Sequence, residues 1–106
     1  MLNRWSCGPG ARTILRMKEH RTIRFFGNVQ GVGFRYSALR EAGGYDLEGY
    51  VRNMPDGSVE VVVEGERADI DAFIQGLESR MSGFIRRKSE QKGPYSGTFG
   101  PFEVGY

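Results

Sequence analysis

The stretch RTIRFFGNVQGVGFRYSALREA, residues 21–42, changes its local pattern twice. Residues 21–29 are rich in β-branched and aromatic side chains, which predicts a strand. Three glycines then follow between residues 27 and 33. The last part, residues 34–42, predicts a helix that Gly43 ends, because its apolar side chains recur at helical spacing. Those side chains are Phe34, Ala38, Leu39 and Ala42.

Downstream of this unit the pattern predicts a hairpin. Residues 47–53, LEGYVRN, and residues 58–64, SVEVVVE, are typical of strands. MPDG between them is a strong turn signal, because Pro and Gly supply the backbone angles that a turn needs. In the second strand, three valines alternate with two glutamates and a fourth valine, which predicts one apolar face. The alternating residues are Val59, Val61 and Val63 against Glu60, Val62 and Glu64.

The clearest helix is RADIDAFIQGLESR, residues 67–80. Its apolar residues fall on one helical face, and acidic residues near its start favour its N-terminal end. Beyond it, residues 84–90 and 101–106 predict short strands. The segment QKGPYSGTFGP, residues 91–101, predicts a loop because glycine and proline interrupt it. The apolar face of the helix consists of Ile70, Phe73, Ile74 and Leu77.

The order of the predicted elements is β-α-β-β-α-β. This order predicts an α+β fold, the ferredoxin-like sandwich, with two helices packed on one face of an antiparallel sheet. The length of 106 residues fits one domain. We assign residues 20–106 to this domain. Residues 1–19 show no sustained periodicity, and we expect them to be a mobile N-terminal extension.

Composition excludes several classes of function. Cys7 is the only cysteine and His20 the only histidine, so no internal disulfide, CxxC redox pair or HExxH zinc site can form. We expect His20, at the start of the ordered region, to be exposed. The sequence contains no run of about 18 apolar residues, so a membrane-spanning helix is excluded. The apolar core of a signal peptide is also absent, and we expect a cytoplasmic protein.

The net charge of +2 is unevenly distributed. Its basic excess lies in residues 1–18, whereas the remaining residues are close to neutral. A near-neutral domain gives little support for nucleic-acid binding, which normally uses a basic face. It remains compatible with a small anionic ligand, because one arginine can serve that purpose. The basic residues of the N-terminal segment are Arg4, Arg12, Arg16 and Lys18.

The glycine loop between the first strand and the first helix is a candidate anion site. Glycine lets a ligand come close to backbone N–H groups, and the following helix adds its positive end. Arg35, in the first turn of that helix, has a fork of donors that matches phosphate oxygens. The loop is not a Walker A motif, which needs GxxxxGK[ST]. From spacing alone, an ordinary glycine-containing loop with a surface arginine is the favoured interpretation.

A second candidate residue is Asn53, in GYVRNMPDGSVE, residues 49–60. It stands where the second strand meets its turn, a position from which a side chain can project past the sheet. The alternative interpretation is that Asn53 is simply a good turn residue, bonding its own backbone.

Two patterns in the sequence carry a resemblance. GNVQGVGFR, residues 27–35, followed by GYVRNMPDGSVE, resembles the two signatures of the acylphosphatase family, G-x-V-Q-G-V-x-F-R and G-x-V-x-N-x-x-D-G-x-V-E. Every specified position is matched, in order, and the resemblance covers about residues 20–106. Acylphosphatases have the ferredoxin-like fold, which agrees with the order of elements predicted above.

The resemblance implies hydrolysis of the carboxyl–phosphate bond of acyl phosphates, without metal or cofactor. By position, Arg35 matches the arginine that holds the phosphate, and Asn53 matches the asparagine that orients the attacking water. Inorganic phosphate, the product, is expected to inhibit competitively. Partners other than small molecules are not expected, neither nucleic acid nor membrane, and we expect a monomer. The residues that match the phosphate cradle are Gln30, Gly31, Val32, Gly33, Phe34 and Arg35.

Two alternatives to the enzyme remain from the sequence. One is a catalytically silent acylphosphatase-like regulatory domain, against which the presence of both Arg35 and Asn53 counts. The other is a nucleic-acid-binding ferredoxin-like module, since RNA-recognition motifs share the same order of elements. In those modules, however, the glycine–aromatic signature lies on a central strand whose aromatic side chains stack on bases. Here it lies in the loop before the first helix.

Overall fold

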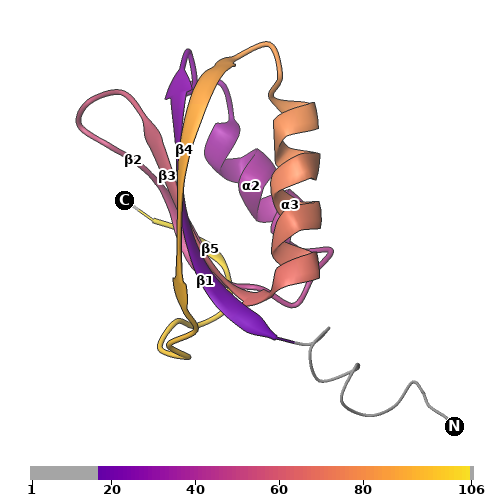
Figure 1. Cartoon of the computed structure of the whole chain (residues 1–106). Coiled ribbons are helices and arrows are strands. Elements are labelled where there is room, and N and C mark those ends of the chain that lie inside the picture. The colour runs from indigo at the N-terminus through magenta and orange to yellow at the C-terminus, as the bar shows by residue number, and fades with distance from the viewer. Residues whose placement is uncertain (1–16, 106) are drawn as a thin grey trace, which may run out of the picture.

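The computed structural model describes residues 17–105, and seven elements follow one another along this part of the chain (Figure 1). Within it, no helix is long and apolar enough to cross a membrane. The elements are β1 (Lys18–Gly27), α2 (Phe34–Ala42), β2 (Glu48–Asn53), β3 (Val59–Glu66), α3 (Arg67–Arg80), β4 (Ile85–Pro94) and β5 (Glu103–Val104).

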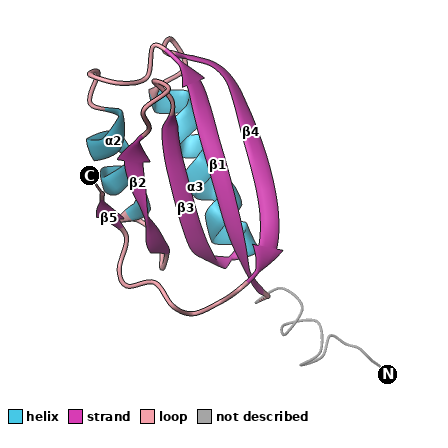
Figure 2. Cartoon of the chain, turned by 90° about the vertical axis from the view of Figure 1, so that its left-hand side faces the viewer, coloured by secondary structure: helices cyan, strands magenta, loops and turns pink. Residues whose placement is uncertain are grey.

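The strands form one sheet in the order β4-β1-β3-β2-β5 (Figure 2). The pairs β4–β1, β1–β3 and β3–β2 are antiparallel, and the two-residue strand β5 pairs with β2 in parallel. Both helices cover the same face of the sheet (Figure 1). The predicted ferredoxin-like α+β fold is therefore confirmed, with β5 added as a parallel strand at one edge.

The hydrophobic core lies between the sheet and the two helices. The alternation predicted for β3 is confirmed, because its three odd-numbered valines face the core. Burying each large apolar side chain contributes about 1.5–3 kcal/mol, so this shared layer holds the helices on the sheet. The apolar residues with no exposed surface are Ile23 and Phe25 of β1, Val51 of β2, Val59, Val61 and Val63 of β3, Ala38 of α2, and Ile70, Phe73 and Leu77 of α3.

Three strands extend beyond their predicted bounds, and β3 does so by two residues, to Glu66. β1 begins at Lys18, inside the segment that we assigned to the extension. β4 continues to Pro94, so the prediction of a loop over residues 91–94 is wrong. The reason is a pairing between distant segments, in which Glu19 of β1 lies opposite Pro94. Such pairing keeps a glycine- and proline-containing segment extended although its local propensity disfavours a strand.

The prediction that His20 is exposed is also wrong. Its side chain is 25% exposed, and its Nδ1 lies 2.7 Å from Oε2 of Glu64, which is completely buried. The two residues meet because the pairing of β1 with β3 places His20 opposite Glu64. Burial at this position is thus decided by a partner strand rather than by sequence neighbours. Residues 1–16 of the segment that we assigned to the extension, Cys7 included, lie outside the described residues.

Candidate functional site

The pairing of the sheet brings two distant turns to one edge. β1 and β2 both pair antiparallel with β3, so they run in the same direction and end on the same side. Phe25 of β1 and Asn53 of β2 are in fact both paired with Val59. The loop that follows β1 and the turn that follows β2 therefore lie at the same end of the sheet.

The loop between β1 and α2 depends on glycine geometry. Gly31 and Gly33 have φ angles of 79° and 78°, in the left-handed region that other residues rarely adopt. Gly33 is also the N-cap of α2, where it provides no side-chain hydrogen bond to the first turn. That turn contains no acidic residue. The positive end of the helix is therefore not offset by a carboxylate of its own turn.

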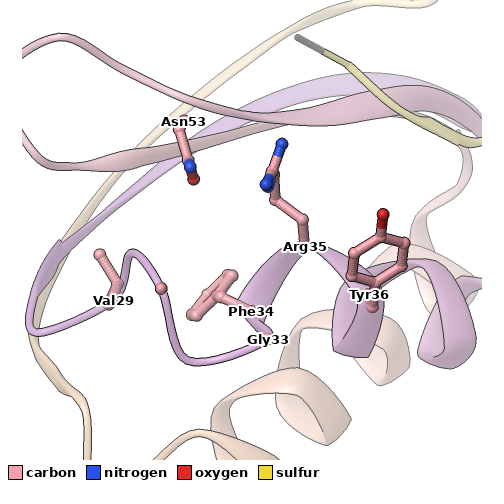
Figure 3. A pocket seen from close by; sticks show the side chains of 7 residues that line it. Val29, Gly33, Phe34, Arg35, Tyr36 and Asn53 are labelled. Carbon is pink, nitrogen blue, oxygen red and sulfur yellow. The ribbon is translucent and has the colours of Figure 1, made fainter.

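Arg35 and Asn53 project into one cavity of about 240 Å³ beside this loop. The guanidinium group of Arg35, from α2, and the amide of Asn53, from β2, point toward each other across it (Figure 3). Among the described residues that line the cavity, Arg35 alone carries a charge. A small cavity with one forked cation and one amide suits a small oxyanion. The lining residues are Val29, Gly31, Gly33, Phe34, Arg35, Tyr36 and Asn53.

The side chain of Gln30 connects the loop to the turn after β2. Its Nε2 donates to the carbonyl oxygens of Met54, at 2.8 Å, and Ser58, at 2.9 Å. These two carbonyls lie at the start and the end of the turn that follows Asn53. Gln30 therefore fixes the distance between the glycine loop and the segment that carries Asn53.

The turn after β2 is shaped by Asp56. Its Oδ1 accepts hydrogen bonds from the hydroxyl of Ser58, at 2.6 Å, and from the N–H of Ser58, at 2.9 Å. Those bonds hold the pKa of Asp56 below its ordinary value. Gly57 adopts a positive φ of 92°, which allows the chain to turn back into β3. The Asp-Gly pair of the second motif thus has a structural role, since it supports the segment that presents Asn53.

The structure brings together most of the residues that the sequence selected. Arg35 and Asn53 line the same cavity, together with three predicted cradle residues, Gly31, Gly33 and Phe34. Two others do not line it. The side chain of Gln30 is turned toward Met54 and Ser58, and Val32 packs against the hydrophobic core.

Two lining residues were not predicted from the sequence, Val29 and Tyr36. Val29 is 1% exposed, so it offers little surface to a bound group. Tyr36, by contrast, is 56% exposed. The signal for Tyr36 was its place next to Arg35, in the first turn of a helix whose start was predicted correctly. Among residues 17–105, no group of three or more His, Cys, Asp or Glu residues could hold a metal ion.

The chain matches the family model described as Acylphosphatase over residues 21–104. A curated relative with the same description, from Paenarthrobacter aurescens (strain TC1), is 44% identical over 84 residues. That alignment covers 78% of this chain and 89% of the relative.

Solved structures share the fold. The crystal structure of acylphosphatase from Bacillus subtilis is 29% identical, with a TM-score of 0.72, and the match covers 85% of this chain and 100% of that one. Full-length HypF, in a phosphate- and nucleotide-bound form, is also 29% identical, with a TM-score of 0.71. There the match covers 86% of this chain but 12% of HypF. The same fold thus occurs as a whole small protein and as one part of a large one.

Proposed function

The chain belongs to the acylphosphatase family, and from this premise we propose that it hydrolyses acyl phosphates to a carboxylate and inorganic phosphate. The observation that carries the proposal is the cavity in which Arg35 and Asn53 point toward each other beside a glycine loop. A cation and an amide at one small cavity provide the two functions that the reaction needs. One holds the phosphoryl group, and the other places a water molecule.

The phosphoryl group is proposed to bind at the start of α2. The guanidinium of Arg35 donates to two phosphate oxygens, and backbone N–H groups of residues 30–34 surround the others. The left-handed φ angles of Gly31 and Gly33 support this arrangement, because they let successive N–H groups converge. The positive end of the helix stabilises the same negative charge.

Asn53 is proposed to orient the attacking water. The oxygen of the water attacks phosphorus, and the bond between phosphorus and the carboxylate oxygen breaks, with its electron pair leaving on the carboxylate. The carboxylate is a good leaving group, so positioning and charge stabilisation are sufficient without a strong general base. The proton of the water passes to an oxygen of the substrate phosphate. No metal or cofactor takes part in this proposed reaction.

The test is an assay of the purified chain with benzoyl phosphate in the presence of EDTA. We expect hydrolysis well above the spontaneous rate, with competitive inhibition by inorganic phosphate, which fits the same cradle. No release above the spontaneous rate would overturn the proposed activity. If such a silent protein still bound phosphate with Arg35 present, the regulatory-domain alternative would replace it.

The cellular setting is a separate part of the proposal. We propose a monomer, because residues of one chain line the cavity that contains Arg35 and Asn53. We also propose that it acts in the cytoplasm on a small-molecule acyl phosphate. Light scattering of the purified chain measures its mass in solution. Fractionation of the source cells then tests the location.

A further inference from the structure

Two aromatic residues flank Arg35, and they present very different surfaces to the cavity. Phe34 is 2% exposed, and its ring packs on that of Phe25 with centroids 5.2 Å apart. Tyr36 lines the same cavity with 56% of its surface exposed. Phe34 is therefore part of the core, whereas the ring of Tyr36 is an apolar surface that a bound group can cover.

The positions of the site residues assign a side of the cavity to each part of the substrate. Asn53 lies on one side of Arg35, and Tyr36 lies on the other (Figure 3). In phosphoryl transfer the attacking and leaving oxygens are roughly in line, on opposite sides of phosphorus. If the phosphate is held at Arg35 and the water at Asn53, the acyl group must leave toward Tyr36.

We infer that Tyr36 contacts the acyl group and makes the enzyme favour aromatic or long apolar acyl phosphates over acetyl phosphate. This inference rests on the proposed function and assigns the side of the site that the proposed function left open. The remaining lining residues support it. Gly31 and Gly33 have no side chain, and Val29 is 1% exposed. Tyr36 is thus the large exposed side chain among the described residues around this cavity.

The chemistry of the two parts of the substrate separates their contributions. The phosphate is the same in every acyl phosphate, so its binding by Arg35 does not distinguish one substrate from another. A benzoyl group can stack on the ring of Tyr36 and cover it, whereas the single methyl group of acetyl phosphate covers little of it. The hydroxyl of Tyr36 is not needed for this contact, because the carboxylate leaves without a proton.

The experiment measures kcat and KM of the full chain for benzoyl phosphate and for acetyl phosphate, in wild type and in Tyr36→Ala. We expect KM for benzoyl phosphate to rise about three- to tenfold, the range of one aromatic contact, and KM for acetyl phosphate to change less than about twofold. Tyr36→Phe should keep the wild-type preference. Tyr95→Ala is the matched control, since Tyr95 is 38% exposed but is not a lining residue of this cavity.

The outcomes separate this inference from the proposed function. Equal changes for both substrates in Tyr36→Ala would overturn the inference while hydrolysis by the wild type keeps the proposed function. Loss of the preference in Tyr36→Phe would also overturn it, because the hydroxyl and not the ring would then make the contact. Hydrolysis of neither substrate by the wild type would overturn both. Circular dichroism of each variant identifies any change that comes from unfolding.

Discussion

Two loops that contain glycine lie at opposite ends of the sheet, residues 28–33 after β1 and residues 95–102 after β4 (Figure 2). The second loop turns its backbone toward the protein. The N–H groups of Ser96 and Gly97 each donate to the carboxylate of Glu64 at 3.0 Å. The first loop borders a cavity, and no carboxylate is among the described residues that line it. Residues 95–102 surround a carboxylate of the protein itself. We propose that residues 28–33 bind the phosphate of the substrate.

We call residues 95–102 the closed loop and residues 28–33 the open loop. The closed loop shows how an anion of the protein is held. Glu64 is completely buried, and it also accepts hydrogen bonds from the hydroxyl of Ser96, at 2.8 Å, and from His20, at 2.7 Å. Burial alone would raise the pKa of Glu64, but the hydrogen bonds from His20, Gly97 and Ser96 outweigh it and hold this pKa below its ordinary value. Backbone N–H groups thus stabilise the fold at one end of the sheet, and we propose that those of the other loop bind the substrate.

The largest expected effect comes from removing Arg35, the cation in the first turn of α2 that follows the open loop. Arg35→Ala should lower kcat/KM for benzoyl phosphate on the order of 10³-fold, because the charge that we propose to hold the phosphoryl group is lost. The free energy of unfolding, measured with urea, should hardly change. Arg52→Ala is the matched control, since Arg52 is bonded to Glu60 at 2.9 Å and lies outside the cavity. Wild-type turnover in Arg35→Ala would remove Arg35 from the mechanism.

The next effect tests the opposite wall of the same cavity. Asn53→Ala should lower kcat about 10²-fold, the scale for losing one positioning contact. KM should change little, because Arg35, which we propose to hold the phosphate, is still present. Steady-state kinetics with benzoyl phosphate separate the two parameters. An increase in KM at unchanged kcat would instead make Asn53 a binding residue.

The carboxylate of Glu64, which the closed loop surrounds, provides a test of stability rather than of activity. Glu64→Gln keeps the shape of the side chain but removes its charge, and it should lower the free energy of unfolding by about 2–3 kcal/mol. Urea unfolding measures this change, and kcat of the folded variant should stay at the wild-type value. Glu48→Gln is the control, because Glu48 accepts one long hydrogen bond, 3.3 Å, from Tyr95. A large loss of kcat in Glu64→Gln would contradict the separation of the two loops.

A smaller effect is expected from removing the side chain of Gln30, which connects the open loop to the turn after β2. Gln30→Ala removes two hydrogen bonds to backbone carbonyls and should lower the free energy of unfolding by about 1–2 kcal/mol. Because Gln30 links the loop to the turn after Asn53, kcat should fall as well, while KM for benzoyl phosphate stays the same. Unchanged kcat with lower stability would limit Gln30 to a structural role.

The smallest effect is the response of the closed loop to acid. The pKa of Glu64 is lowered in the folded protein, so its contribution to stability is complete above its ordinary value of 4.5 and is lost as the pH falls through the folded pKa. Urea midpoints measured at pH values below 4.5 should therefore fall more steeply in wild type than in Glu64→Gln. Some acid sensitivity should remain in that variant, because the pKa values of Glu19 and Asp56 are lowered too. Equal slopes would contradict the assignment to Glu64.

Local signals predicted the helices to the residue. The bounds of α2, Phe34–Ala42, and α3, Arg67–Arg80, match the predicted ranges, because apolar spacing and the residues that end a helix are both local. The strands were less predictable. β4 continues through Gly93 and Pro94 because β1 pairs with it, and the burial of His20 depends on Glu64 of β3.

The residues of the site also divide into those that local patterns predicted and those that depend on distant contacts. Motif spacing selected Arg35 and Asn53, and the pairing of β1 and β2 with β3 explains why they reach one cavity. The catalytic roles of both residues stay predictions. The contacts of Gln30 were not foreseen, since its two acceptors lie in a turn that is distant in sequence. Tyr36 was missed because nothing in helical spacing tells whether a ring at the start of a helix faces a cavity.

The shared pairing of Phe25 and Asn53 with Val59 has a consequence for how the protein folds. Side chains on a strand alternate between the two faces, so a slip of β2 by one residue would move Asn53 to the face away from Arg35. A chain with a misaligned sheet would keep much of its hydrogen bonding yet lose its reactive geometry. Recovery of enzymatic turnover during refolding would therefore report the moment at which the strands reach their native alignment, later than the formation of secondary structure alone.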